Sequence, residues 1–278
     1  MPVMEGQIGE LRWRYLPCAP PAHLTPFVRS YAGYLEEAPA EVVRRELPFP
    51  GLVMIVELEP ALRLGPNTRP FPRGFVAGIG GLPVATRFRR RQHGLQVDLS
   101  ALGARALFGV DASELEGEVV PLEDLGADEL AERLADCPDW PSRFDLTTAF
   151  FERRLERVNT DLRVAQWLLD AVEAAGGNRP IAELVDESGY SHGYLGRLCR
   201  RDLGLTPKQL SRLVRFRRFV ERLRGPGPAT APLPTFGSLA AELGYADQSH
   251  MVREVRQLTG GWRPSELLAQ TSPELLPL

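Results

Sequence analysis

The residues with the clearest chemical potential are arginines. Between Ser188 and Arg224 the chain has ten basic side chains against two acidic ones, whereas residues 1–160 hold 18 basic and 23 acidic side chains. A guanidinium group can bind a phosphate, or the edge of a guanine, through two parallel hydrogen bonds. The alternative is a solvated helix face, and the net charge of −3 for the whole chain argues mildly against nucleic acid. The arrangement of the helices that carry these arginines distinguishes nucleic-acid binding from a solvated helix face.

An internal repeat surrounds the basic segment. Three pairs of motifs recur in the same order: Gly189-Tyr190 and Gly244-Tyr245, Leu195-x-Arg197 and Met251-x-Arg253, Gly204-Leu-Thr-Pro207 and Gly261-Trp-Arg-Pro264. A short apolar helix is predicted before each Gly-Tyr pair. Each copy therefore predicts helix, glycine turn and second helix, which is the helix-turn-helix plan. One such motif is weak evidence for DNA binding, but two copies are far more specific.

A long helix is predicted between the two copies, from Pro207 to Arg224. It has apolar side chains at helical spacing and begins with a Thr-Pro cap. Eighteen residues span roughly 27 Å, close to the repeat of about 34 Å that separates successive major-groove segments on one face of a duplex. The Gly- and Pro-rich stretch from Gly225 to Pro234 predicts a loop before the second copy.

These motifs resemble the AraC/XylS family of bacterial transcriptional regulators over about residues 163–270. The run Gly244-Tyr-Ala-Asp-Gln-Ser-His-Met-Val-Arg-Glu-Val255 carries most of the resemblance. Two positions that are often aromatic in the family are Cys199 and Val255 here, and a third is Met251. We expect these smaller side chains to lie in the core. The resemblance implies a DNA-binding domain with one recognition helix in each copy.

The recognition helices are predicted from about Ser191 to Arg201 and from about Asp247 to Leu258, with Asp247 as an N-cap. Gly193 and Gly196 have no side chain to read a base, so the first helix depends on its remaining residues. Arg197 is a candidate for guanine readout, with a phosphate contact or a structural ion pair as its alternative roles. The candidate DNA contacts on these helices and on the linking helix are His192, Tyr194, Arg197, Arg201, Lys208, Arg212, Gln248, Ser249, His250, Arg253 and Arg256.

The N-terminal half has a different pattern of predicted secondary structure. Short β-favouring runs occur at 52–58, 75–78 and 95–99, and helical segments follow from Ala101. This half resembles, less specifically, cupin-like sensor domains. We therefore predict an α+β chain: a small N-terminal β-barrel with accessory helices, and a C-terminal all-α domain of two helix-turn-helix units joined by a long helix. The predicted domains are 1–160, for ligand sensing or dimerisation, and 161–272, for DNA binding.

Other chemistry has little support in the sequence. The three cysteines, Cys18, Cys137 and Cys199, lack disulfide or zinc-site spacing. The chain lacks the clustered histidines of a metal-dependent cupin, and no phosphate-loop, dinucleotide or nucleophile-elbow motif occurs. Arg87–Arg91 and His93 are interpreted as a solvated edge strand, with an anion-binding pocket as the alternative. We expect no catalytic residue, no metal and no cofactor.

The leading hypothesis is a cytoplasmic, sequence-specific regulator controlled by its N-terminal domain. The expected partners are double-stranded DNA and a small-molecule effector, with RNA polymerase and a second copy of the chain as further candidates and no membrane. One alternative is a DNA-associated enzyme or repair protein, which needs a reactive cysteine. Another is a helical interaction module that has lost DNA binding. The salt dependence of binding separates the last hypothesis from the first.

Overall fold

The structure is a computed structural model that describes residues 3–59, 62–64, 69–80, 83–157, 160–224 and 235–270. Its strands are β1 (Met4–Ile8), β2 (Leu11–Cys18), β3 (Val28–Glu46), β4 (Gly51–Glu59), β5 (Arg63–Leu64), β6 (Arg69–Pro70), β7 (Gly74–Ala77), β8 (Val84–Ser100) and β9 (Val119–Pro121). Its helices are η1 (Ala22–Leu24), η2 (Ala104–Phe108), η3 (Ala112–Leu115), η4 (Leu122–Leu125), α1 (Asp128–Ala135), α2 (Trp140–Arg157), α3 (Arg163–Ala174), α4 (Ile181–Ser188), α5 (His192–Leu203), α6 (Pro207–Arg224), α7 (Phe236–Glu242), α8 (Gln248–Leu258) and α9 (Pro264–Gln270).

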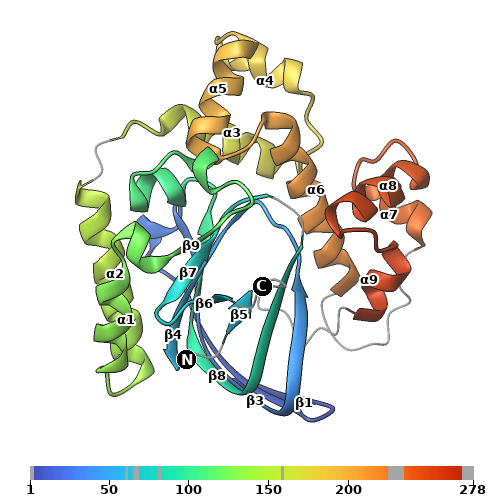
Figure 1. The fold of residues 1–278 in the computed structure, drawn as a ribbon. Coiled ribbons are helices and arrows are strands. Elements are labelled where there is room, and N and C mark those ends of the chain that lie inside the picture. The colour runs from blue at the N-terminus through green and yellow to red at the C-terminus, as the bar shows by residue number, and fades with distance from the viewer. Residues whose placement is uncertain are drawn as a thin grey trace.

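The strands form one strongly curved antiparallel sheet of nine strands, in the order β1-β2-β3-β8-β4-β7-β9 with β5 and β6 off this path. The helices α1 and α2 cover one face, and the helices from α3 to α9 lie at the end and the side of the sheet (Figure 1). The prediction of an N-terminal β part followed by a C-terminal helical part is confirmed. We call residues 3–157 the sheet region and residues 160–270 the helical region.

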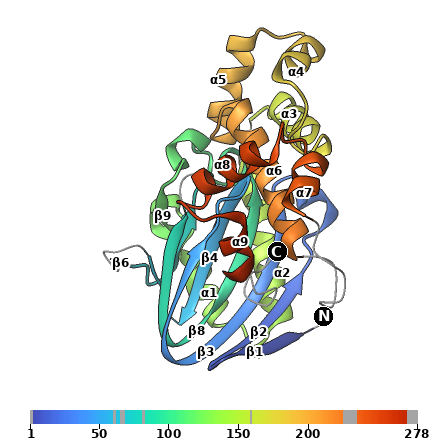
Figure 2. The same cartoon turned by 90° about the vertical axis from the view of Figure 1, so that its right-hand side faces the viewer.

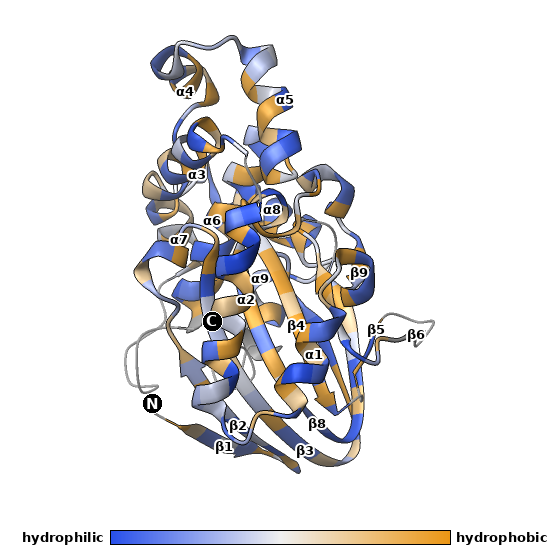
Figure 3. Cartoon of the chain, turned by 90° about the vertical axis from the view of Figure 1, so that its left-hand side faces the viewer, coloured by the Kyte–Doolittle hydropathy of each residue, from blue (hydrophilic) through white to orange (hydrophobic). Residues whose placement is uncertain are grey.

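Strand alternation gives the sheet two different faces. On β8, Leu95, Val97 and Leu99 are fully buried in the core beneath α1 and α2. Gln96 and Asp98, between them, face the other way and line a cavity on the concave side. Because successive side chains of a strand point to opposite faces, the apolar-polar alternation of this segment separates core from cavity. Figure 3 shows how strongly apolar β4 is within the same sheet.

The helical region contains the two predicted units. The first unit comprises α4 and α5, and the second comprises α7 and α8. Gly189 and Gly244 form the turns at φ values of 70° and 75°, a left-handed conformation that glycine adopts without strain. The helix α6 joins the units, and Figure 2 shows α6 between them. The predicted loop from Gly225 to Pro234 lies outside the described residues.

The two regions share a hydrophobic core. Ile79, Ala101 and Leu102 of the sheet region are fully buried together with side chains of α3, α5 and α6. At the C-terminus of α5, Gly204 lies directly against the sheet region. A Cβ atom placed there would be 2.5 Å from Cγ2 of Ile79 and 2.9 Å from the carbonyl oxygen of Ala112. The first unit is therefore docked against the sheet region through close packing.

The second unit contacts the sheet region differently. The guanidinium carbon of Arg45, on β3, lies 4.5 Å from the ring centroid of Trp262. Leu47 packs against the apolar core of this unit. A cation over an aromatic ring contributes roughly 0.5–1 kcal/mol at exposed sites. The second unit is thus attached through a smaller set of contacts than those that hold the first unit.

The structure corrects two details of the sequence interpretation. The segment Arg87–Arg91 is an edge on one side only in part: β8 pairs with β3 throughout the segment, and on the other side Arg87 pairs with β5, while pairing with β4 begins at His93. The strands are also longer than expected, and β1, β2 and the 19-residue β3 precede the predicted β segment. Arg90 adopts φ 66° beside the register shift between Ala38 and Glu41, where the sheet bends.

Candidate DNA-binding surface and sheet cavity

Both recognition helices begin with a side-chain cap. Ser191 accepts a hydrogen bond from the Tyr194 backbone N–H, and Asp247 accepts one of 2.6 Å from the His250 N–H. Such caps satisfy backbone donors that the first turn leaves free. The expected N-cap role of Asp247 is confirmed, and the helices fall within two residues of their predicted limits.

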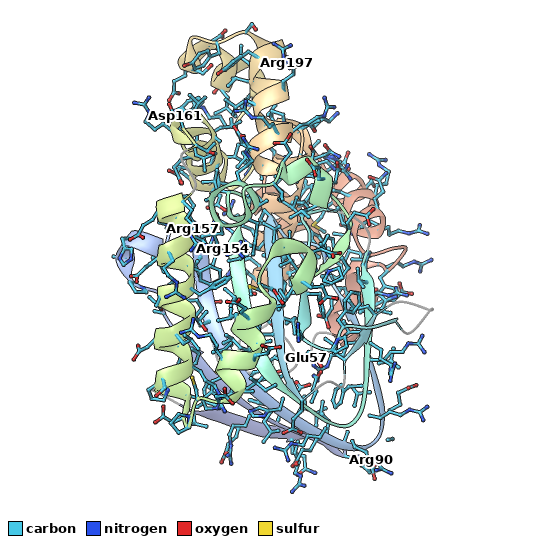
Figure 4. The ribbon with its side chains drawn as sticks, turned by 60° about the vertical axis from the view of Figure 1, so that its left-hand side comes forward. Glu57, Arg90, Arg154, Arg157, Asp161 and Arg197 are labelled. Atoms are coloured by element: carbon cyan, nitrogen blue, oxygen red, sulfur yellow. The ribbon has the colours of Figure 1, made fainter. Side chains whose placement is uncertain are left out.

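Corresponding residues in the two units form matching exposed faces. Arg197 and Arg200 on α5 occupy the repeat positions of Arg253 and Arg256 on α8, and all four side chains are exposed. None of the four forms an ion pair within the described part of the chain. Figure 4 shows Arg197 at the end of the molecule opposite Arg90. These faces present free guanidinium groups, the chemistry that phosphate and guanine require.

Arg200 was missed by the sequence interpretation, which selected its neighbour Arg201. The structure places Arg201 in a two-point ion pair with the fully buried Asp202, at 2.7 Å for both contacts. Asp202 also lies 3.5 Å from Arg105 of the sheet region. The repeat itself carried the missing signal, because Arg256, the partner of Arg200 in the second unit, was already a candidate.

Arg212 has an internal partner as well. Its Nε atom lies 3.1 Å from Glu254, and its Nη2 donates to Gln257 at 2.7 Å. Arg215, one turn further along α6, lies 3.2 Å from the same carboxylate. Glu254 is almost completely buried, so these two arginines fix α8 against α6. A phosphate contact by Arg212 stays a prediction beside this packing role.

The other predicted contacts differ in their surroundings. His192, Lys208, Gln248 and Ser249 are exposed. His250 packs edge-on against the Tyr245 ring, 5.5 Å between ring centroids. Tyr194 stacks on Tyr190 at 4.7 Å, and both tyrosines are among the few large exposed aromatic side chains of the described residues. Tyr190 was not a candidate in the sequence interpretation, although it adjoins the repeated glycine of the turn.

The three core substitutions noted in the sequence are buried. Cys199, Met251 and Val255 are completely inaccessible to solvent. Burial raises the pKa of the Cys199 thiol to about 12. The same cause raises the pKa of Cys18, so both thiols are disfavoured as thiolate nucleophiles.

A cavity of about 470 Å³ lies on the concave face of the sheet. Much of its wall is apolar, from side chains that include Val53, Ile55, Leu62, Leu64, Phe75, Ala77, Val84 and Val119. Its polar wall includes Tyr15, Ser30, Tyr34, Arg44, Glu46, Thr86, Gln92, Gln96 and Asp98. Enclosed cavities with an apolar wall and a few polar groups are the usual form of a small-molecule site.

The helical region supplies one side of this cavity. Arg217, Val220 and Glu221 of α6 belong to its lining. Arg217 lies 3.5 Å from Glu173 of α3, and Arg29 of the sheet region donates to the same carboxylate at 2.6 Å. The helix that joins the two DNA-binding units therefore also borders the cavity.

The described part of the chain holds no group of three or more His, Cys, Asp or Glu side chains arranged for a metal ion. Among the described residues, no helix has the length and apolar character that crossing a membrane requires.

Comparison with known proteins identifies the helical region. Residues 184–270 match the model of a helix-turn-helix domain family of the AraC type. No curated protein matches the chain. Among solved structures, the chain is similar to ToxT from Vibrio cholerae O395, at 11% identity and a TM-score of 0.46, over 95% of this chain and 100% of that one. A second ToxT structure from Vibrio cholerae gives 10% identity and a TM-score of 0.49 over 95% and 99% of the two chains.

The family match and the two capped units define the class. The helical region holds an AraC-type helix-turn-helix domain, a DNA-binding class, and the match covers residues 184–270 of the chain. The part that matches the family model contains α5, α6 and α8, the elements that carry the exposed arginines.

Proposed function

We propose that this chain is a transcriptional regulator that binds operator DNA through α5 and α8, and that occupancy of the sheet cavity controls that binding through α6. The observation that carries the proposal is the double position of α6, which joins the two units and borders the cavity. A ligand that contacts α6 in one arrangement and not in another would shift the population of the two. The division into a sensing domain at 1–160 and a DNA-binding domain at 161–272 is part of this proposal.

The exposed arginines divide into two proposed roles. Arg197 and Arg253 lie in the central turns of their helices, and we assign them to base edges in the major groove. Arg200, Arg256 and Lys208 we assign to phosphates, which position a protein on DNA without reading its sequence. Docking to the sheet region involves Leu203 and other residues near the C-terminus of α5. The N-terminal half of α5 stays exposed, and this half of a recognition helix usually contacts the base edges.

We also propose that the chain has no catalytic activity of its own. The enzyme alternative needs a reactive cysteine, whereas burial raises the pKa values of Cys18 and Cys199. A second copy of the chain and RNA polymerase stay predicted partners.

Selection from a random duplex library with the full chain tests the DNA-binding part. We expect an enriched motif with two half-sites, one for each unit. Binding of the selected duplex is then measured by fluorescence anisotropy for Arg253→Ala and for Arg153→Ala, an exposed arginine of α2 that serves as the control. No enriched motif, or binding that does not weaken with added salt, would favour the interaction-module alternative.

The control by the cavity is tested separately. Glu221→Ala changes the α6 side of the cavity at an exposed position that is not among the DNA contacts. If the cavity controls DNA binding, small molecules that bind the full chain will change its affinity for the selected duplex, and this variant will change the size of that effect. An unchanged duplex affinity at saturating ligand would contradict the proposed control.

A further inference from the structure

The charges around the sheet cavity do not balance within the protein. Arg44 lies 2.8 Å from the fully buried Glu36, and Arg29 and Arg217 both contact Glu173. Each arginine of the wall is thus matched by a carboxylate. Two further carboxylates of the wall, Asp98 and Glu46, form no ion pair within the described part of the chain.

Asp98 is the clearer of the two. It is 7% exposed, and its oxygens accept hydrogen bonds from Ser30 Oγ at 2.7 Å and from Gln96 Nε2 at 2.8 Å. Both donors are neutral. Burial raises the pKa of Asp98, and no cationic side chain opposes that effect. A buried carboxylate in such a position is costly to ionise without a counter-charge.

Glu46 lies at the other end of β3. Its carboxylate accepts a hydrogen bond from Thr86 Oγ1 at 2.7 Å. Burial raises its pKa, although the Thr86 hydrogen bond and nearby Arg44 act in the opposite direction. Since Asp98 pairs with the beginning of β3 and Glu46 ends it, the two carboxylates are separate positions in an elongated wall.

Several buried polar atoms of the wall also lack a hydrogen-bond partner among the described residues, and one of them is Nε of Arg44, a donor on a guanidinium group that is already paired with Glu36. The Tyr34 hydroxyl and Oε1 of Gln92 have no hydrogen-bond partner among the described residues, and these side chains are 4% and 5% exposed. Nε2 of Gln92 already donates to Glu36, so its free oxygen can only accept. A ligand that satisfies this atom must therefore carry a hydrogen-bond donor, which a carboxylate headgroup does not have.

We propose that the cavity binds an organic amine, a molecule with an apolar body and a protonated amino group that pairs with Asp98 or Glu46. An ammonium group offers three donors and one positive charge, matching the acceptors and the unpaired carboxylates of the wall. The body lies along Val53, Ile55 and Phe75. The inference rests on the proposed function only in taking this cavity as the ligand site.

Calorimetric titration of the full chain with octylamine, octanol and octanoate tests the ligand class. The three probes share one apolar body and differ in the headgroup. We expect octylamine to bind at least about tenfold more tightly than the other two, a difference of about 1.4 kcal/mol. Tightest binding by octanoate, equal binding of octylamine and octanol, or no binding of any probe would overturn the proposal.

Variants then locate the amino group. Asp98→Asn or Glu46→Gln should remove the preference for octylamine over octanol, while Asp136→Asn, an exposed aspartate outside the cavity, should retain it. Retention of the preference in both cavity variants would contradict the proposal. A far-ultraviolet spectrum of each variant shows whether it folds. If Asp98→Asn does not fold, the charge-conserving Asp98→Glu replaces it, and we expect this variant to retain the preference for octylamine.

Failure of this inference is distinguishable from failure of the proposed function. If octylamine binds in an Asp98- or Glu46-dependent way but leaves the affinity for the selected duplex unchanged, the ligand class stands and the control of DNA binding fails. If no probe binds while the duplex still binds, the ligand class fails and DNA binding stands.

Discussion

Arg29 of β3 donates to Glu173 of α3 at 2.6 Å, and this ion pair joins the sheet region to the helical region. Arg217 of α6 lies 3.5 Å from the same carboxylate. One glutamate therefore connects the sheet, the first helix of the helical region and the helix that joins the two units. Both guanidinium groups would lose their shared counter-charge if the glutamate were neutral.

We expect Glu173→Gln to lower the free energy of unfolding by about 1–2 kcal/mol, because the pairs are partly shielded from solvent. Glu132→Gln is the control, since Glu132 is 61% exposed in its pair with Arg73. Surface pairs of that kind contribute little. Chemical denaturation of both variants measures the difference. Equal losses in the two variants would show that Glu173 has no special role between the regions.

A second prediction concerns Gly204, which combines a left-handed backbone with a close contact. Its φ is 77°, and an added Cβ atom would be 2.5 Å from Ile79 of the sheet region. Gly189 has a similar φ of 70° and has nothing within 4 Å of the same atom. Both alanine variants therefore carry a similar backbone strain, and only Gly204→Ala also disturbs the docked interface.

We expect Gly189→Ala to cost about 1 kcal/mol, and Gly204→Ala to cost about 1–3 kcal/mol more from overpacking. Thermal unfolding of the full chain compares the two. The docked arrangement would be wrong if the two glycines tolerated alanine equally well.

The sequence predicted the helical region better than the sheet region. Glycine turns, caps and the repeated pattern of an apolar residue two positions before an arginine are local signals, so the limits of α5 and α8 could be predicted closely. The segment before Leu47 holds β2 and β3, whose mixed polar and apolar residues follow two half-buried faces. Their pairing with β8 depends on residues distant in sequence, and a strand of that kind gives only a weak local pattern.

The internal partners of the arginines were equally hidden. Arg212 meets Glu254 across 42 positions of sequence, and Arg105 meets Asp202 across the junction of the two regions. The sequence therefore predicts a single basic surface between Ser188 and Arg224, whereas in the structure some of these arginines are free and others form internal ion pairs. The cavity could not be predicted either, because Asp98 and Gln96 alternate with core residues and would face water in an open sheet.

The recognition arginines give a third prediction. We expect Arg253→Ala to weaken binding of the selected duplex by about 1–3 kcal/mol and to relax the preference at one base pair. Arg256→Ala should weaken all duplexes alike and reduce the salt slope by about one. Anisotropy titrations over a range of salt concentrations, with matched and single-mismatch duplexes, separate these effects. If Arg253→Ala left the base preference intact, its assignment to base readout would be incorrect.

The fourth prediction compares two buried aspartates. Asp202 is fully buried and contacts Arg201 and Arg105, whereas Asp98 accepts only neutral hydrogen bonds. Removing the charge of Asp202 leaves Arg201, whose side chain is 49% exposed, without its partner, while Arg105 keeps its pair with Asp111. We therefore expect Asp202→Asn to lower the free energy of unfolding by about 1–2 kcal/mol at neutral pH. Asp98→Asn should have no such cost, because Ser30 can reverse its hydrogen bond and donate elsewhere.

The pH dependence of the Asp98 variant follows from the direction of its pKa shift. Burial raises the pKa of Asp98 above its ordinary value of 3.8 in the folded chain, so the folded state binds the proton more tightly than the unfolded state. The stabilisation from that proton is complete below pH 3.8 and is lost as the pH rises through the folded pKa. Asparagine, which is neutral at every pH, avoids this loss. The thermal midpoint of Asp98→Asn relative to the unsubstituted chain should therefore rise with pH across this window and level off above it. A difference that stayed constant between acidic and neutral pH would mean that Asp98 does not titrate as its surroundings require.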